Sequence, residues 1–154
     1  LSENEALSHS LNLIDPIFQP YIKGFELSID AYIDNNMKIK GLIMRKRDVV
    51  VNGESQITSL YKNIEFENIF KVFLNKLNLN GHVMLQAIVD VNNKIHIVEC
   101  NPRYGGASSL SIYCGLDSFY WFFLECHGLE LDDYDFKKTN NKTTQIRFSK
   151  NMYI

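Results

Sequence analysis

The chain has 154 residues, of which 45% are hydrophobic and 22% are charged, and its formal net charge is −2 at pH 7. This balance is that of an ordinary globular domain with enough chain to bury a sizeable core. Nucleic acid is not expected as a partner, because a basic patch is needed and the only dense basic run is Arg45–Lys46–Arg47.

The first third of the chain predicts a helix followed by two strands. Ser2 and Glu5 fit a capping box at the start of a short amphipathic helix. Residues 17–22 predict a strand, which Pro20 restricts to a sheet edge or an irregular segment. Residues 25–33 then alternate between apolar and polar side chains, which indicates a strand with one buried face.

A first hairpin is expected next. Asn35–Asn36 suits a two-residue turn, because Asn tolerates a positive φ, and residues 37–47 would form the return strand. This register places Glu26 opposite Arg45, so the two side chains would form an ion pair worth at most about 1 kcal/mol if exposed. Both Arg45 and Arg47 are typical of solvated strand charges, and we favour Arg47 of the two for a phosphate or substrate carboxylate.

An amphipathic helix and a second hairpin follow. Apolar residues at helical spacing predict a helix over residues 65–77. Strands at 82–90 and 94–100 would pair around Asn92–Asn93, and since both faces of this hairpin are largely apolar, the sheet should be covered on both sides. Two helical segments and a last edge strand are expected beyond it, at 107–114, 117–127 and 144–148. This order of elements indicates an α+β fold.

The second hairpin brings three side-chain oxygens together. A turn at 92–93 places Gln86 opposite Glu99. Asn101 shares the face of Glu99, because side chains alternate along a strand. Hard divalent cations such as Mg²⁺ prefer oxygen ligands, with substrate phosphates completing the shell. The alternative is an ion pair between Glu99 and Arg103 with Gln86 as a hydrogen-bonded neighbour, and the spacing leaves both interpretations open.

Several smaller features have two interpretations. Gly105–Gly106 ahead of a helix is typical of an anion site at a helix N-terminus, or simply of a turn with Ser108 as the cap. The aromatic run 119–123 is expected on a buried helix face or at a domain interface. Three histidines lack metal-ligand spacing and are expected in the core or on the surface: His82, His96 and His127.

The cysteines and the apolar runs bear on cellular location. The cysteines are odd in number and have no C-x-x-C spacing, so they are expected to be small buried residues in a reducing compartment: Cys100, Cys114 and Cys126. The longest apolar run, 119–124, is too short to span a bilayer, and no signal-peptide pattern is visible. A cytoplasmic protein that does not enter a membrane is therefore expected.

The segment VECNPRYGG, residues 98–106, resembles the E-x-N-P-R signature of ATP-grasp enzymes, most closely the ATP-binding domains of carbamoyl-phosphate synthase large chains. In the same order, GHVMLQAIVD (81–90) resembles the preceding metal-ligand strand. IFQPYIKGFELSID (17–30) resembles the hinge strand over the adenine and the acidic residue that holds the ribose, and NGES (52–55) resembles a loop between these blocks. The resemblance implies the C-terminal portion of an ATP-grasp fold, an antiparallel sheet with helices packed on it.

The resemblance also implies roles for matched residues. Gln86, Glu99 and Asn101 would ligate Mg²⁺ (or Mn²⁺) that bridges the ATP phosphates. Arg103 would be the catalytic residue, in contact with the phosphates or an acyl-phosphate intermediate, and Glu26 would bind the ribose hydroxyls. Many members carry Glu where this chain has Gln86, which lowers the local negative charge. Nucleotide contacts at the hinge would come from Gln19, Tyr21 and Ile22.

The activity implied is that of an ATP-dependent carboxylate–amine ligase, in which MgATP converts a carboxylate into an acyl phosphate and an amine then displaces the phosphate. A non-catalytic nucleotide-binding or regulatory module with the same fold is the alternative. The family's strand lysine, Gly-rich loop and N-terminal substrate domain have no counterpart before Asp15, and the chain starts without Met. We therefore expect residues 1–154 to be the C-terminal portion of a grasp that is inactive alone, with ATP and a small carboxylate or amine substrate as partners.

Overall fold

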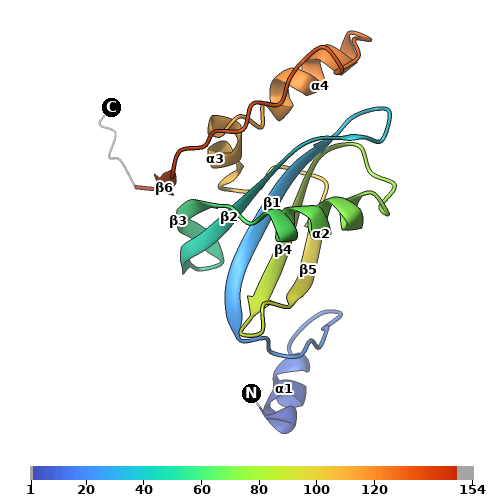
Figure 1. Ribbon diagram of the computed structural model, residues 1–154. Coiled ribbons are helices and arrows are strands. Elements are labelled where there is room, and N and C mark those ends of the chain that lie inside the picture. Colours follow the sequence, from blue (N-terminus) through green and yellow to red (C-terminus); the bar gives the residue numbers. More distant parts are fainter. Residues whose placement is uncertain (1, 149–154) are drawn as a thin grey trace, which may run out of the picture.

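The computed structural model describes residues 2–148, which form a six-stranded antiparallel sheet with helices on both faces (Figure 1). The strands are β1 (Gly24–Ile33), β2 (Ile39–Val51), β3 (Glu54–Tyr61), β4 (Gly81–Asp90), β5 (Ile95–Asn101) and β6 (Thr144–Ile146). The helices are α1 (Glu3–Ser10), α2 (Ile64–Leu74), α3 (Ser108–Tyr113) and α4 (Ser118–Cys126). The sheet order is β5-β4-β1-β2-β3-β6, and the predicted α+β class is confirmed.

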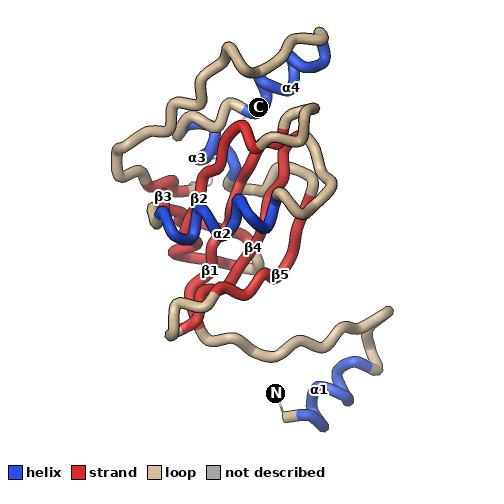
Figure 2. Tube along the Cα trace, turned by 45° about the vertical axis from the view of Figure 1, so that its right-hand side comes forward, coloured by secondary structure: helices blue, strands red, loops and turns tan. Residues whose placement is uncertain are grey.

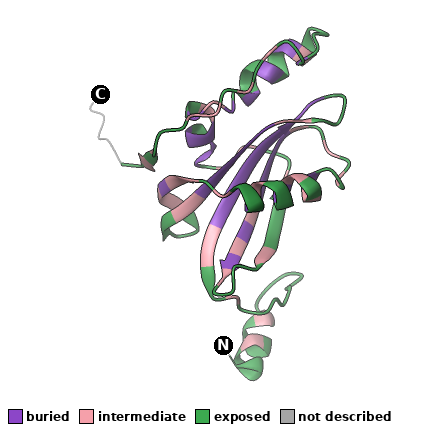
Figure 3. Ribbon diagram, viewed as in Figure 1, coloured by how far each residue is buried: buried purple, intermediate pink, exposed green. Residues whose placement is uncertain are grey.

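The two faces of the sheet are covered by different helices. On one face, Leu27 and Ile29 of β1 pack in a core with Phe70 of α2, and α2 crosses the strands on this side (Figure 2). On the other face, Tyr32 of β1 packs with Trp121 of α4 and with residues of α3. The middle of β1, β2 and β4 is consequently buried (Figure 3). The edge strand β5 is mostly exposed, so the expectation that the second hairpin is covered on both faces is wrong for β5.

Two strand predictions are wrong. Residues 17–22 form no strand and pair with none of the six strands, in agreement with the irregular course that Pro20 allows. Strand β3 was not expected, and it pairs with β2 through a tight turn at Asn52–Gly53. The last strand lies where it was expected, as β6, and it pairs with β3.

Both long hairpins turn through three residues rather than two. In the β1–β2 hairpin Asp34 and Lys38 close the loop, and Met37 has a φ of 62°. In the β4–β5 hairpin Asp90 and Lys94 close the loop in the same way. In each loop the Asp carboxylate accepts two backbone N–H groups, which favours the longer turn.

The extra turn residue affects the two registers differently. In the β1–β2 pair a second register shift, between Tyr32 and Ile33, adds one residue to the offset from the turn, so that Ser28 pairs with Arg45. The predicted pairing of Glu26 with Arg45 is therefore wrong. In the β4–β5 pair a bulge between Gln86 and Ala87 cancels it. The predicted pairing of Gln86 with Glu99 is therefore confirmed.

The N-terminal part and the cysteines differ in their burial. The capping box of Ser2 and Glu5 is confirmed, but α1 lies beyond the end of the sheet and contributes no buried residue (Figure 1). Cys114 is buried as expected, whereas Cys100 and Cys126 are exposed, Cys100 because it lies on the edge strand β5. No helix in the described part of the chain is long and apolar enough to cross a membrane.

Candidate functional site

The three predicted metal ligands lie on one face of the sheet, the face that also carries α3. Gln86 of β4 is directly opposite Glu99 of β5, and Asn101 is opposite Met84. The Asn101 amide nitrogen donates to Glu99 Oε1 at 2.8 Å, which leaves the amide oxygen of Asn101 free of that contact. The alternative ion pair between Glu99 and Arg103 does not form, since Arg103 Nη1 donates to the backbone carbonyl of Tyr104 at 3.2 Å.

The chemistry of this donor set fits a hard cation that also binds phosphate. It offers one carboxylate and two amide groups, and the described residues contain no cluster of three His, Cys, Asp or Glu side chains that could hold a metal by itself. Mg²⁺ accepts such a partial set of oxygens, because substrate phosphates and water complete its shell. The metal role of Gln86, Glu99 and Asn101 stays a prediction.

Arg47 connects this donor set to the rest of the sheet. Its Nη1 donates to Glu26 Oε2 at 2.5 Å and to Gln86 Oε1 at 3.2 Å. Its Nε donates to Ser55 Oγ at 2.9 Å and its Nη2 to the carbonyl of Gly53 at 2.6 Å. All three guanidinium nitrogens of Arg47 thus have partners. Glu26, the residue to which the resemblance assigns the ribose, forms an ion pair with Arg47.

A second polar group, Asp30 of β1, is completely buried on the same face. Oδ2 accepts from Arg45 Nε at 2.7 Å and from Ser111 Oγ at 2.5 Å. Oδ1 accepts from Ser108 Oγ at 2.6 Å and lies 3.2 Å from His82 Nε2. Burial opposes ionisation of Asp30, but the charge of Arg45 and the hydrogen bonds from His82 and Arg45 outweigh it and hold the pKa well below its usual range.

Arg45 has a buried donor without a partner. Its side chain is 2% exposed, Nε is shared by Asp30 and Ser111, and Nη1 has no hydrogen-bond partner. A buried guanidinium N–H without a partner is costly, so such a group indicates a ligand position more strongly than a saturated side chain does. The preference for Arg47 stays a prediction, and the unpartnered Nη1 makes Arg45 a candidate as well.

The buried cluster fixes the loop that carries Arg103. Ser108 Oγ accepts from the Gly105 backbone N–H at 2.8 Å while it donates to Asp30. Tyr104 is stacked between two rings, His82 at 4.0 Å and Phe119 at 4.3 Å between centroids. Ser108 is consequently not a helix cap; Ala107 occupies that position without a side-chain bond, and α3 has only 6 residues. His82, expected in the core or on the surface, is buried.

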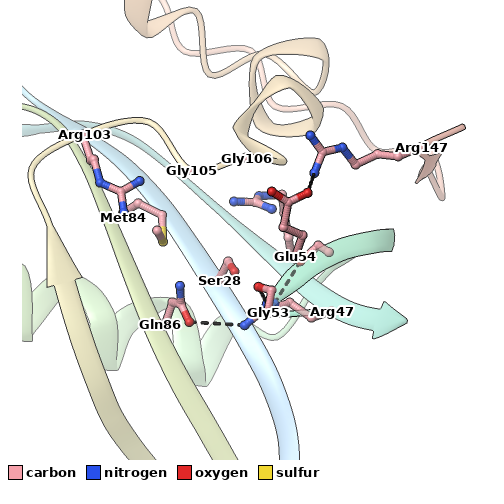
Figure 4. A pocket seen from close by; sticks show the side chains of 12 residues that line it. Ser28, Arg47, Gly53, Glu54, Met84, Gln86, Arg103, Gly105, Gly106 and Arg147 are labelled. Carbon is pink, nitrogen blue, oxygen red and sulfur yellow. Dashed lines mark hydrogen bonds and ion pairs between the residues drawn. The ribbon is translucent and has the colours of Figure 1, made fainter. Parts of the chain in front are cut away.

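A cavity of about 260 Å³ opens beside Gln86 and Arg103. Figure 4 shows Arg103, Met84 and Gln86 on one side of it and Glu54 with Arg147 on the other. Arg147 Nη1 donates to Glu54 Oε2 at 3.2 Å, and both side chains are substantially exposed. The complete lining is Ser28, Arg45, Arg47, Gly53, Glu54, Ser55, Met84, Gln86, Arg103, Gly105, Gly106 and Arg147.

An apolar hollow of about 220 Å³ lies at the other end of β4. The hinge residues Gln19 and Ile22 line it together with Ile88 of β4. Tyr21, also predicted at the nucleotide, is exposed and does not line this hollow. Ile88, Gln86 and Met84 alternate along one face of β4 at intervals of roughly 7 Å, so the apolar hollow, the oxygen donors and the arginine-lined cavity follow one another along a single strand.

Four residues of this region were not predicted as site residues: Asp30, Arg45, Glu54 and Arg147. The alternation along β1 predicted only one buried face and put Asp30 on the polar one, so neither the burial of this carboxylate nor its four partners were predicted. Arg147 reaches the cavity only because β6 pairs with β3, and a three-residue edge strand carries little sequence signal.

Solved structures similar to this chain are ATP-grasp enzymes. The biotin carboxylase domain of the Hydrogenobacter thermophilus 2-oxoglutarate carboxylase has a TM-score of 0.66 at 14% identity over 82% of this chain and 30% of that chain. Biotin carboxylase from Campylobacter jejuni has a TM-score of 0.64 at 16% identity over 84% and 31%. N5-carboxyaminoimidazole synthase from Aspergillus clavatus has a TM-score of 0.66 at 11% identity over 83% and 35%. At these identities the likeness shows an ATP-grasp fold.

The chain matches one family over residues 13–150, and it belongs to that family, described as ATP-grasp in the biosynthetic pathway with Ter operon. No match was found among curated proteins. The chain spans about a third of the length of the three solved structures. Membership of the ATP-grasp superfamily is thus confirmed, while the closer resemblance to carbamoyl-phosphate synthases stays a prediction.

Proposed function

We propose that this chain is the MgATP-binding part of an ATP-dependent carboxylate–amine ligase that works through an acyl phosphate. The observation that carries the proposal is the convergence of Gln86, Glu99 and Asn101 on one sheet face beside Arg103, in a chain of the ATP-grasp family. The solved relatives support it: one is described with MgADP and bicarbonate, another with ADP and 5-aminoimidazole ribonucleotide.

The nucleotide would lie along β4. Its base would occupy the apolar hollow at Ile88, where burial of the flat faces of an aromatic ring is favourable, with Gln19 and Ile22 in the lining and Tyr21 between them along the hinge. The ribose would meet Glu26, which requires Glu26 to share its carboxylate between Arg47 and the sugar hydroxyls. This order leaves the phosphates beside the oxygen donors and next to the arginine-lined cavity.

Gln86, Glu99 and Asn101 would hold Mg²⁺ (or Mn²⁺), which neutralises phosphate charge when bound. Arg47 would have to release Gln86 Oε1 for this, and its bonds to Glu26, Gly53 and Ser55 keep it in place when it does. Arg103, at the cavity, would contact the transferred phosphoryl group and the acyl phosphate through charge-assisted hydrogen bonds.

The proposal takes residues 1–154 as the C-terminal portion of the grasp. The strand lysine and the Gly-rich loop that close over the nucleotide in this superfamily would then come from a further segment. The large exposed apolar side chains near the hinge, including Ile14 and Ile17, are consistent with such a partner surface.

Titration of MgADP into the chain and into two variants tests the proposal. Glu99→Gln should weaken binding by about tenfold or more, because it removes the one carboxylate of the donor set. The matched control Glu65→Gln lies on α2, on the other face of the sheet, and should bind like the parent. Equal affinity in all three proteins would contradict the proposal. A non-catalytic nucleotide-binding module would show the same binding but no phosphate release in the complete polypeptide.

A further inference from the structure

We propose that the acid substrate of this site carries a second anionic group, a carboxylate or a phosphate, which binds between Arg45 and Arg147. The inference rests on the proposed function, since it takes the group beside Arg103 to be the reacting carboxylate. It assigns the substrate class as dianionic carboxylic acids.

The charge of the cavity favours such a substrate. Four guanidinium groups line it, those of Arg45, Arg47, Arg103 and Arg147, against the single carboxylate of Glu54. Two of these charges are already compensated, because Asp30 pairs with Arg45 and Glu26 with Arg47. The positive charges of Arg103 and Arg147 are not compensated by a buried carboxylate. The acidic side chain in the lining is Glu54, which pairs with Arg147 and is 68% exposed.

The unpartnered donor of Arg45 indicates where the second group binds. The Nε of Arg45 donates to Asp30 and Ser111, and its Nη1 is buried without an acceptor. Arg45 also lines the cavity, so an acceptor that reaches Nη1 from there removes the existing penalty of an unpaired buried N–H. An anionic oxygen gains most from this, since hydrogen bonds between charged groups are the stronger ones.

The cavity has two ends that match two anionic groups. Arg103 lies on the side of the oxygen donors, beside Met84 and Gln86 (Figure 4). Arg147 lies across the cavity, where its guanidinium comes close to Gly106 (3.6 Å from the position of a Cβ there) and contacts Glu54. A substrate bound at Arg103 by its reacting carboxylate therefore extends toward Arg45 on β2 and Arg147 just after β6.

Nuclear magnetic resonance titration of the 154-residue chain with three acids of equal chain length tests the inference, at one ionic strength because salt screens exposed charges. Glutarate and 4-phosphonobutyrate carry two anionic groups, and the monoamide of glutarate carries one. We expect one or both dianions to bind about tenfold more tightly than the monoamide, and the tighter of the two identifies the second group as carboxylate or phosphate.

Two variants and one control locate the effect. Arg147→Gln should remove most of the tenfold preference for the dianions. Arg45→Lys keeps the positive charge beside Asp30 but loses the planar guanidinium with its several N–H donors, and it should reduce the preference about threefold or more. Lys76→Gln, an exposed cation beyond α2, should leave it unchanged. Equal binding of the three acids, or an undiminished preference in both arginine variants, overturns the inference.

Titration with MgADP in the same samples separates the inference from the proposed function. If MgADP displaces the dianion, the cavity belongs to the nucleotide phosphates and the inference is wrong. If MgADP binding is absent or insensitive to Glu99→Gln while the dianion preference persists and depends on Arg147, the proposed function fails and the anion subsite stands.

Discussion

Asp30 and Arg45 form an ion pair of 2.7 Å between β1 and β2 in which the two side chains are 0% and 2% exposed. The pair lies beneath the arginine-lined cavity and joins the sheet to α3 through Ser108 and Ser111. Because a buried charge that loses its partner is costly, removal of either side chain should lower the free energy of unfolding and disturb the cavity above the pair.

Asp30→Asn should destabilise the chain by about 3–5 kcal/mol, because it leaves the Arg45 guanidinium buried without a counter-charge. Urea unfolding at pH 7 measures the difference. Asp132→Asn, which removes the exposed partner of Lys38, is the control and should cost about 1 kcal/mol or less. Equal effects of the two substitutions would mean that the buried pair contributes no more than a surface pair.

The same variant has a predictable pH dependence. The pKa of Asp30 is lower in the folded chain than in the unfolded one, so its contribution to stability is fully present above the unfolded value, about 3.9, and is lost as the pH falls below it. The difference in unfolding free energy between the parent chain and Asp30→Asn should therefore stay constant from pH 7 to about 5 and shrink toward pH 3. A difference that grows toward acid pH would contradict the assignment.

Glu26→Gln tests the ribose contact against the simpler role of an Arg47 partner. The Glu26 carboxylate is about half exposed, so loss of the ion pair alone should cost about 1 kcal/mol or less in unfolding free energy. A ribose ligand would in addition weaken MgADP binding by about fivefold or more. Unchanged MgADP affinity together with a small loss of stability would leave Glu26 as a structural partner of Arg47.

Tyr104→Leu should loosen the loop that carries Arg103. The ring is stacked between His82 and Phe119, and each aromatic pair contributes about 0.5–1.5 kcal/mol. We expect a loss of about 1–3 kcal/mol in stability and weaker binding of glutarate, whereas Tyr104→Phe should retain both. Thermal unfolding and the glutarate titration check the two effects separately, and wild-type glutarate affinity in a destabilised Tyr104→Leu would show that the stack does not position Arg103.

With residues 1–154 taken, as proposed, as the C-terminal portion of the grasp, the chain by itself should release no more phosphate from ATP than Glu99→Gln does. The strand lysine and the Gly-rich loop would form the lid over the nucleotide from a further segment, and loss of one phosphate-clamping donor alone costs about a hundredfold or more in rate. A steady-state phosphate-release assay on the purified chain measures this, with Glu99→Gln as the background. Turnover that depends on Glu99 would show that the lid functions are already present or come from a second copy.

The secondary structure was largely predictable because β1 and α2 show their periods plainly, whereas the turns were not. Asp34 and Asp90 lengthen both hairpin loops by one residue, an effect of carboxylate hydrogen bonds that a count of Asn residues misses. The bulge after Gln86 then restored one register, and the shift after Tyr32 displaced the other by a second residue. The pairing of Gln86 with Glu99 was thus predicted correctly although the turn behind it was not.

The site was predictable only where it follows a single hairpin. Gln86, Glu99 and Asn101 belong to neighbouring strands joined by a short loop, so their distance follows from local register. Arg45 and Arg147 meet at one cavity through the pairing of β3 with β2 and of β6 with β3. The pairing of β6 with β3 is long-range and is encoded by no short sequence pattern, whereas the β2–β3 turn at Asn52–Gly53 is a local hairpin signal that was interpreted as a loop.

The segment between α1 and β1 has a consequence for limited proteolysis. Residues 16–23 lie in no helix or strand, and Phe18 and Tyr21 are exposed, as is Lys23 just before β1. A protease such as trypsin or chymotrypsin should cut here before it cuts the sheet, since cleavage needs an extended and accessible backbone. Cleavage after Tyr21 or Lys23 would keep the arginine-lined cavity and the oxygen donors but remove Gln19, so the shortened and intact chains should bind small anions alike and differ only toward nucleotides.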